Sequence, residues 1–525
     1  MLINKKTGPF FTVFIIAVIS IIIMITGGCG NSNAVQEEAS SDNKTKEPVT
    51  YTIADTVGDW GFPAPYSHYL RGPGYVRMSF IFETLVWKDA EGLVGNLAES
   101  WEYDEEENFF TFYLRQDVKW HDGEKFTADD VLFTYDYVKK HPYAWANTGM
   151  IDRVETLDAY TLKIYLDEPF APFLENVAGT LPIIPEHIYK SVENPQNFTD
   201  SKAAIGTGPF KLADYNKEQG TYLFEANYDY YLGEPLVDRI RSIKVGAQML
   251  PSVVLNKTAN VASIPPEMMQ EFKDKNFSVL LQDHSSIVRL MFNHQKEPFS
   301  NKELRHAIAY AIDLENLVAI SQRGNALTGS SGMLPPDNPW YSADINTYEF
   351  NPEKAKEILQ QLGYTGLEIS LLTKSNNARD AELIKFNLEK VGISVDIVSF
   401  DDKTVDNRIN NWNFQLAINL HGGLGGDPQN LNKFISADDF NSARYYENKV
   451  LNELLARQVT IMDRFERQEV VAEIQKIYSE ELPDIALYYP DAPYAHDGKV
   501  DLFFTPGGIA IGVPIPLNRL SFVSY

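Results

Sequence analysis

The part of the chain that can form a hydrophobic core is too long for a single core. After residue 49, aromatic side chains begin at Tyr51 and continue to Tyr525. A single core stops growing at about 250–300 residues, and longer chains divide into domains. We therefore predict two or more domains. The only cysteine, Cys29, excludes an internal disulfide.

Strand and helix patterns occur together in this part of the chain. Residues 109–114, FFTFYL, are aromatic and β-branched, and residues 160–166, YTLKIYL, alternate apolar and polar side chains, which is typical of strands. TADD at 127–130 and SNKE at 300–303 fit capping boxes at helix starts. Residues 351–363 begin with Asn-Pro and end with Gly, which indicates another helix. The mixture predicts an α/β fold.

Two proline-rich breaks suggest where the domains meet. Ile264-Pro265-Pro266 follows a strand-like piece, and YPDAP occupies residues 489–493. Paired breaks fit a chain that leaves one lobe, builds a second and returns. We expect lobe I over 50–265, lobe II over 266–489, and a return to lobe I over 490–525.

The N-terminus has the pattern of an export signal. Lys5 and Lys6 precede an apolar run over residues 10–25, and TGGC follows at 26–29. A charged start, an apolar run and small residues before a cleavage site describe a signal peptide, here residues 1–28. The alternative is a permanent membrane span, which needs roughly 18 or more apolar residues.

Cys29 lies where the small residues end, and Gly-Gly-Cys resembles the lipobox at which bacterial lipoproteins are cleaved and acylated. Thr26 stands where that pattern usually has Leu. The alternative is an unmodified cysteine. Residues 31–48 contain no aromatic side chain and one Val, too little apolar surface to offset the entropy of ordering. We therefore predict a lipid-anchored flexible linker over residues 29–49.

The charge of the chain excludes some partners. The sequence has 46 basic and 72 acidic residues, a formal net charge of −26, and two of the basic residues lie in the predicted signal. An acidic surface argues against nucleic acid and against docking on anionic lipid. A solvated acidic face explains the charge, and a cationic substrate is the alternative.

The sequence lacks the motifs that most enzyme classes carry. GSSG at 329–332 has the wrong spacing for a serine nucleophile, and GGLGGDP at 422–428 has Asp-Pro where a dinucleotide loop needs Gly and a helix. The nine histidines form no His-x-His or His-x-x-x-His pair. We therefore predict that the protein is not an enzyme. An exported hydrolase remains the alternative from that class, and a structural or chaperone-like surface protein is a third.

Aromatic residues, 12% of the chain, occur beside Gly and Pro in loop-like segments. Residues 67–75, residues 141–145, and the segment from Trp412 to His421 are examples. Apolar walls with a few polar groups are how proteins hold small ligands. For each single aromatic residue, an ordinary place in the core is an equally good interpretation.

Five segments, with residues 97–131 counted as one, together resemble one protein family. LAESW at 97–101, LRQDVKWHDG at 114–123 and TADDV at 127–131 are similar to the signature of extracellular solute-binding proteins of family 5, which serve peptide, nickel and opine ABC importers. IGTGPF at 205–210 and NYDYYLGEP at 227–235 continue the match in order. Residues 291–318 and 350–364 resemble helices of that family's second lobe.

The resemblance implies a fold and a way of working. It implies a two-lobed α/β fold of the type II, dipeptide-binding-protein-like class, with an extra subdomain inserted in lobe I, here residues 83–205. Two crossover strands would join the lobes, and the lobes would close on the ligand by a hinge motion. The closed form would dock on the permease of the membrane complex.

The solute stays open at this stage. In peptide-binding relatives an Asp often pairs with the amine of the peptide, but Leu424 occupies that position here, and His421 stands where Trp is usual. In nickel-type relatives a His falls on the position of Asn419. Trp145 matches an aromatic residue of the nickel type, while Pro142 replaces its Arg.

We expect a solute receptor of an ABC importer that binds a peptide or peptide-like compound, with a nickel or metal chelate as the alternative. No cofactor is expected beyond such a chelate as ligand, and no resident metal, although His421 is the candidate ligand in the chelate interpretation. Expected partners are the permease and ATPase, and the membrane through the N-terminal lipid, at the extracellular face or in the periplasm. We expect a monomer. The candidate ligand contacts are Tyr69, Arg71, Tyr75, Trp145, His421 and Asp427.

Overall fold

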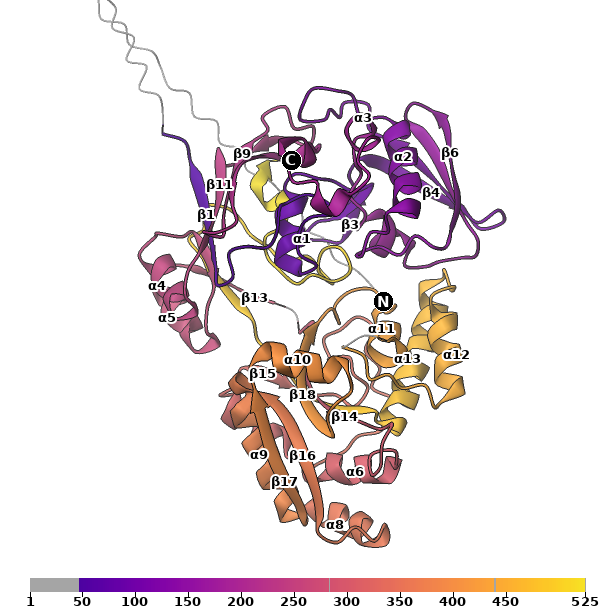
Figure 1. The fold of residues 1–525 in the computed structure, drawn as a ribbon, viewed down its shortest axis with the longest axis vertical. Coiled ribbons are helices and arrows are strands. Elements are labelled where there is room, and N and C mark those ends of the chain that lie inside the picture. The colour runs from indigo at the N-terminus through magenta and orange to yellow at the C-terminus, as the bar shows by residue number, and fades with distance from the viewer. Residues whose placement is uncertain (1–46, 283, 439–440, 525) are drawn as a thin grey trace, which may run out of the picture. The chain divides into compact units, whose positions relative to one another are not determined.

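The computed structural model describes residues 47–282, 284–438 and 441–524 (Figure 1). The predicted signal peptide, Cys29 and nearly all of the predicted linker lie outside these residues. The chain from Pro48 onward forms one compact unit. Among the described residues, no helix is both long and apolar enough to span a bilayer.

Lobe I is built on a seven-stranded mixed sheet in the order β13-β20-β12-β1-β11-β9-β8. Strand β1 pairs in parallel with β11 and β12, and the other pairings are antiparallel. Its strands are β1 Thr50–Asp55, β8 Phe210–Asn216, β9 Thr221–Ala226, β11 Arg239–Lys244, β12 Val261–Ser263, β13 Ser278–Leu281 and β20 Pro493–His496. Helices α1 Gly72–Ser79, α4 Leu250–Leu255 and α5 Met269–Asp274 belong to this lobe.

A smaller antiparallel sheet, in the order β4-β5-β7-β6, lies within the predicted insertion. Its strands are β4 Ala98–Asp104, β5 Phe109–Leu114, β7 Thr161–Leu166 and β6 Ile151–Asp158, and α2 Ala128–Lys140 contributes to the same hydrophobic core. The predicted strands at 109–114 and 160–166 are confirmed within one residue. The capping box is confirmed too, because the Thr127 side chain bonds the third helical N–H and Asp130 bonds back.

Short elements complete this lobe. They are the pairs β2 Val86–Lys88 with β3 Leu93–Gly95 and β10 Glu234–Pro235 with β21 Val523–Ser524, helix α3 Glu186–Tyr189, and the single-turn π-helix η1 Phe173–Ala178. Because β21 pairs with β10, the C-terminal segment returns to lobe I.

Lobe II is a six-stranded mixed sheet in the order β15-β19-β14-β18-β16-β17. Its strands are β14 Ser286–Phe292, β15 Ala326–Thr328, β16 Leu367–Lys374, β17 Ile393–Phe400, β18 Leu416–Gly422 and β19 Asp484–Pro490. Its helices are α6 Lys302–Ala311, α7 Leu314–Ser321, α8 Pro352–Gln361, α9 Ala378–Lys390, α10 Asp402–Asn410, α11 Asn430–Ser436, α12 Lys449–Gln458 and α13 Arg464–Glu481.

Both faces of this second sheet are covered by helices. On β14, Val288 and Leu290 pack into the core formed with α6 to α9, while Ile287 packs into the core formed with α11 to α13. A strand that is buried on both faces reads as an apolar run, which explains the sequence IVRLMF apart from Arg289, a buried residue that pairs with Asp484 at 2.5 Å. These findings confirm the two-lobed α/β class.

One predicted helix start is off by one residue. The N-cap of α6 is Asn301, whose side-chain oxygen accepts from the N–H groups of Glu303 at 2.9 Å and Leu304 at 3.4 Å. Ser300, the predicted cap, donates its hydroxyl to Glu297 instead. The Asn351 cap of α8 is confirmed, with its side chain accepting from the N–H of Lys354 at 3.0 Å.

The chain changes lobe later than the first proline break. Strands β12 and β13 both pair with β20 in the lobe I sheet, so the chain stays in lobe I through Leu281. The crossing lies between Leu281 of β13 and Ser286 of β14, later in the chain than the predicted boundary at residue 265. Pro265-Pro266 instead introduces a 3-10 turn that leads into α5. The return crossing lies between Pro490 of β19 and Pro493 of β20.

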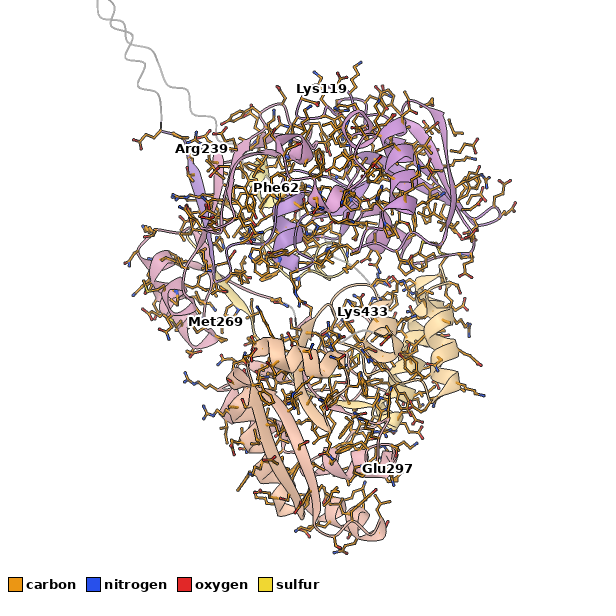
Figure 2. The ribbon with its side chains drawn as sticks, viewed as in Figure 1. Phe62, Lys119, Arg239, Met269, Glu297 and Lys433 are labelled. Carbon is orange, nitrogen blue, oxygen red and sulfur yellow. The ribbon has the colours of Figure 1, made fainter. Side chains whose placement is uncertain are left out.

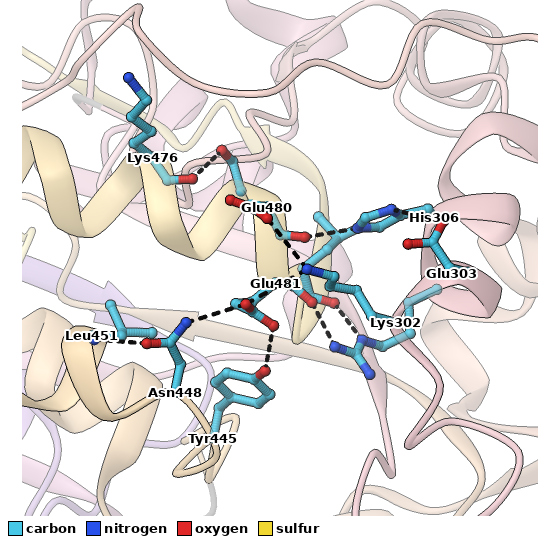
Figure 3. Close-up of polar contacts among 12 residues, drawn as sticks. Lys302, Glu303, His306, Tyr445, Asn448, Leu451, Lys476, Glu480 and Glu481 are labelled. Carbon is cyan, nitrogen blue, oxygen red and sulfur yellow. Dashed lines mark hydrogen bonds and ion pairs between the residues drawn. The ribbon is translucent and has the colours of Figure 1, made fainter.

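A polar network fixes the C-terminal end of α13 to its neighbours (Figure 3). The Glu481 carboxylate accepts from the Tyr445 hydroxyl at 2.6 Å and from the Asn448 side chain at 3.1 Å, and Lys302 of α6 lies 3.7 Å away. Hydrogen bonds to its ionised form hold the pKa of Glu481 below its usual range although burial acts against this. The network therefore stabilises lobe II behind the face that meets lobe I.

Candidate functional site

A cleft of about 1040 Å³ has walls from both lobes. Lobe I contributes the end of α2, the loop over residues 142–149 and η1. Lobe II contributes α11 and the residues around it, and Ile511 comes from the C-terminal return. The volume reaches the upper end of the range for small-molecule sites, roughly 300–1000 Å³.

An aromatic cluster supports the lobe I wall. The Trp145 ring lies 5.0 Å from the ring of Tyr75 and 6.1 Å from that of His68. Tyr75 is fully buried and donates its hydroxyl to the carbonyl of Thr180 at 2.8 Å. Tyr75 therefore lies behind Trp145, whereas Trp145 itself lines the cleft.

His68 is held as a neutral imidazole within this cluster. Its Nδ1 lies 2.9 Å from the carbonyl of Tyr69, which can only accept, and its Nε2 lies 3.3 Å from the Tyr143 hydroxyl. Burial lowers the pKa of His68 to about 4. At neutral pH, Nδ1 therefore donates to the carbonyl and Nε2 accepts from Tyr143, which fixes the start of the 142–149 loop.

The lobe II wall depends on a buried ion pair. Asp427 follows the glycine-rich loop after β18, and both of its carboxylate oxygens bond Arg467 of α13, at 2.6 and 2.7 Å. It also accepts from the backbone N–H of Gln429 at 2.7 Å. Burial raises the pKa of Asp427, and the bonds from Arg467 oppose that shift. Asp427 thus positions α11 at the cleft, and its oxygens are occupied.

Direct contacts join the lobes beside the cleft. The Asn176 side chain donates to the Gln429 side chain at 2.6 Å, and the N–H of Ala171 donates to the carbonyl of Val459 at 2.8 Å. The Asn430 amide donates to Gly423 at 2.7 Å and to the carbonyl of Ile511 at 3.3 Å. Side-chain amides therefore form much of the border between the lobes.

Two glycine-rich loops meet there backbone to backbone. A Cβ on Gly426 would lie 3.2 Å from the Cα of Gly512, and one on Gly507 would lie 2.6 Å from the carbonyl oxygen of Gly425. Gly507 and Gly512 also have positive φ angles of 72° and 98°. The GGLGG run resembles a nucleotide loop by composition, but its glycines instead allow its backbone to lie against the backbone of the second glycine-rich loop.

The other residues predicted to contact the ligand do not lie together in the structure. Tyr69 lines a separate depression of about 600 Å³ on lobe I, and Arg71 is the N-cap of α1, outside the lining of the large cleft. His421 is buried under Phe434, with ring centroids 4.3 Å apart. Of the six candidates, Trp145 alone is among the described residues that line the large cleft.

His421 lies in a buried polar layer of lobe II. Burial lowers its pKa well below the usual range, and the charge of Arg289 adds to this. Within the described part of the chain, its Nε2 and both polar side-chain atoms of Asn419, two positions earlier on β18, have no hydrogen-bond partner. No group of three or more His, Cys, Asp or Glu able to hold a metal is found among the described residues. A neutral imidazole could bind a metal, but the described chain surrounds it with no further ligand.

Sequence reasoning missed the polar residues of the cleft. Five amide side chains belong to the lining, namely Asn147, Asn176, Gln429, Asn430 and Asn432. The single signal that could have found some of them is the QNLNK run directly after Asp427-Pro428. No sequence pattern indicated that Asn176 lines the cleft, because its position depends on how the subdomain packs against lobe II.

Comparison with known proteins agrees with this architecture. The family model for bacterial extracellular solute-binding proteins, family 5 Middle, matches residues 92–442. The di/tripeptide-binding protein 3 of Pseudomonas aeruginosa is 28% identical over 494 residues, covering 84% of this chain and 92% of the relative.

Two solved structures share the fold. DppA of Helicobacter pylori in complex with the peptide STSA matches with a TM-score of 0.73 and 25% identity, over 91% of this chain and 98% of that chain. NikZ of Campylobacter jejuni in complex with Ni(L-His) matches with a TM-score of 0.76 and 23% identity, over 91% and 99%. With a two-lobed fold, a cleft walled by both lobes and a family model that spans most of the chain, this protein belongs to family 5 of the bacterial extracellular solute-binding proteins.

Proposed function

We propose that this protein captures a peptide or peptide-like solute in the cleft between its lobes and delivers it to the permease of an ABC importer. The observation that carries the proposal is the cleft of about 1040 Å³ with walls from both lobes. A site shared by two lobes couples binding to their relative position, which a receptor needs if its partner is to recognise the loaded form.

The lining favours a solute rich in amide groups. A side-chain amide offers both a donor and an acceptor, as a peptide unit does. Asn176 is 6% exposed, and its buried Oδ1 has no hydrogen-bond partner among the described residues. The buried Nε1 of Trp145 has none there either. A peptide's N–H and C=O groups would supply these two partners if the side chains turn toward the solute on binding.

A nickel chelate is the second candidate, and His421 supports it. The neutral imidazole with an unpartnered Nε2 is the form that binds metals. The candidate is weaker because His421 is 5% exposed and is not among the residues that line the cleft. In either case the solute is cargo, and the protein needs no resident cofactor for this role.

Three further statements belong to the proposal. Cys29 carries a lipid that holds the protein at the extracellular face of the membrane, the protein acts as a monomer, and the solute leaves the cleft chemically unchanged. The sequence lacks catalytic motifs such as a serine nucleophile elbow, which supports the statement that the solute is not altered. Mass analysis of the N-terminal peptide tests the lipid, and light scattering tests the monomer.

Native mass spectrometry of the purified protein, with metal analysis of the same sample, tests the function. We expect a stoichiometric peptide mass, or one-to-one complexes when a tripeptide library is added. Stoichiometric nickel with a small chelator would replace the peptide with the second candidate. Turnover of an added peptide library would contradict the role of receptor.

A further inference from the structure

Among the described residues that line the cleft, one charged side chain has no partner within the described part of the chain. Among its described lining residues the charged side chains are Lys139, Lys433 and Asp438. Lys433 is an exposed residue of α11, on the side of lobe II that meets lobe I (Figure 2). It forms no ion pair or hydrogen bond with residues 47–282, 284–438 or 441–524.

The other two charges are already compensated. The ammonium of Lys139 lies 3.9 Å from the Asp136 carboxylate and donates to the carbonyl of Asp152 at 3.2 Å. The Asp438 carboxylate lies 3.2 Å from the guanidinium of Arg444. The described lining therefore presents one net positive charge, although the whole chain has a formal charge of −26.

Among the described lining residues, Asp438 is the one carboxylate that a solute's amine could meet, and it already pairs with Arg444. Both oxygens of Asp427 bond Arg467, and one of them also accepts a backbone N–H. Leu424, in the loop between β18 and Asp427, is 3% exposed and packs in the core of lobe II. A buried ammonium without a counter-charge is costly, and away from Asp438 the described lining offers an enclosed amine only neutral groups.

We propose that this cleft selects its solute by a carboxylate, which Lys433 binds, and that it requires no free amine. The inference rests on the proposed function and names the class of solute: a peptide or peptide-like compound with a free C-terminal carboxylate. Its N-terminus is blocked or lies outside the enclosed part of the cleft. The side-chain amides then bind the peptide units between the two ends.

The bond between Lys433 and a solute carboxylate should change the solute's affinity by a measurable amount. A hydrogen bond to a charged group contributes about 1.5–3 kcal/mol, which corresponds to a roughly ten- to hundredfold change in affinity. Lys433 is exposed, so solvent screening places the effect near the lower end of that range. Loss of the solute's carboxylate should thus weaken binding about tenfold, while acetylation of its amine should change binding by less than about threefold.

The test uses a library of tripeptides without charged side chains, prepared with four kinds of ends. The four are free at both ends, acetylated at the N-terminus, amidated at the C-terminus, and blocked at both. Each is added to the purified protein, and one-to-one complexes are counted by native mass spectrometry. We expect complexes with the free and the acetylated forms, and about tenfold fewer with both amidated forms.

Two lysine variants connect the effect to its residue. Lys433→Met should bind acid and amide forms equally, because no cation then distinguishes them. Lys139→Met is the matched control, since it removes a lysine from the same cleft that is already paired, and it should preserve the preference for the acid. Thermal unfolding of each variant verifies that the fold is kept.

The outcomes separate the two proposals. Binding that is lost on acetylation, or that is equal for acid and amide forms, overturns the inference and leaves the receptor for peptides intact. A preference for the acid that persists in Lys433→Met also overturns the assignment to Lys433. If none of the four libraries forms a complex, the peptide function fails, and the inference fails with it.

Discussion

His284 connects the two segments by which the chain passes between the lobes. Its Nε2 lies 3.1 Å from Oδ1 of Asp491, and its Nδ1 lies 2.6 Å from Oδ2 of Asp337. His284 belongs to the crossing between β13 and β14, and Asp491 to the return between β19 and β20. The two ring nitrogens of one histidine therefore lie against two carboxylates from different segments of the chain.

Replacement of His284 should loosen this connection. In His284→Gln the imidazole that bridges Asp337 and Asp491 is gone, so the two carboxylates are left without their shared partner. We expect small-angle X-ray scattering of the solute-free protein to show a broader distribution of lobe separations than in wild type. Apparent solute affinity should fall a few-fold, in proportion to the fraction of binding-competent protein.

The matched control for that variant is His187→Gln. His187 also pairs with an aspartate, Asp122 at 2.8 Å, but it lies within lobe I, away from both crossings. It should leave scattering and affinity unchanged. Scattering curves for His284→Gln that coincide with wild type would contradict a role of this histidine at the crossings.

The ion pair of Asp427 and Arg467 should be necessary for the stability of lobe II. Both side chains are 5% exposed, so Arg467→Met leaves a buried carboxylate without its partner. We expect a loss of about 3–5 kcal/mol in the free energy of unfolding, measured by urea denaturation. Arg467→Met combined with Asp427→Leu should recover most of it, because no charge then stays buried. A double variant no more stable than the single one would show that packing, and not charge, explains the loss.

His68 should make stability depend on pH. Burial places its folded-state pKa at about 4, below the ordinary 6.5, so between these values the unfolded chain binds the extra proton. The contribution of His68 is therefore complete above pH 6.5 and is lost as the pH falls toward 4. The difference of 2.5 pH units corresponds to on the order of 3 kcal/mol.

This dependence can be measured by urea denaturation at pH 7 and pH 5. His68→Gln removes the titrating ring, so the variant should lose less stability over this interval than wild type does. The free energy of unfolding changes with pH by different amounts in wild type and variant, and this difference gives the contribution of His68 alone. Other buried histidines contribute equally to both proteins, such as His121, whose pKa burial also lowers to about 4. Equal slopes would show that His68 is accessible to protons in the folded state.

Trp145 should contribute to binding through its indole N–H as well as its ring. Nε1 is buried without a hydrogen-bond partner at the wall of the cleft. Trp145→Phe keeps an aromatic ring and removes the donor, and we expect roughly fivefold to tenfold weaker binding of tripeptides in titration calorimetry. Trp101→Phe, which changes a half-buried tryptophan on β4 outside the cleft lining, should not alter affinity. If Trp145→Phe binds tripeptides as tightly as wild type, the indole N–H does not contact the solute, and Trp145 serves only to pack the 142–149 loop.

The sequence by itself determined the class of fold and most local structure. Strands such as β5 and caps such as Asn351 depend on neighbours within a few positions, and those neighbours are visible in the sequence. Length set the need for more than one domain, and the motif series indicated the family that the comparison then showed. Even so, the cap of α6 moved from Ser300 to Asn301, because a local pattern does not decide which of two adjacent polar side chains turns toward the helix.

The cleft, in contrast, was decided by tertiary structure alone. Asn176 and Gln429 are 253 positions apart and meet through a hydrogen bond between lobes. Asp427 looked like a ligand contact and proved to be fully bonded by Arg467 from α13. In the sequence Lys433 is indistinguishable from any surface lysine. The structure shows that it lines the cleft, where the other charged side chains of the described lining are paired. Local patterns record what a residue needs from its neighbours in the chain, whereas a binding site depends on which groups remain unpaired after distant segments have packed.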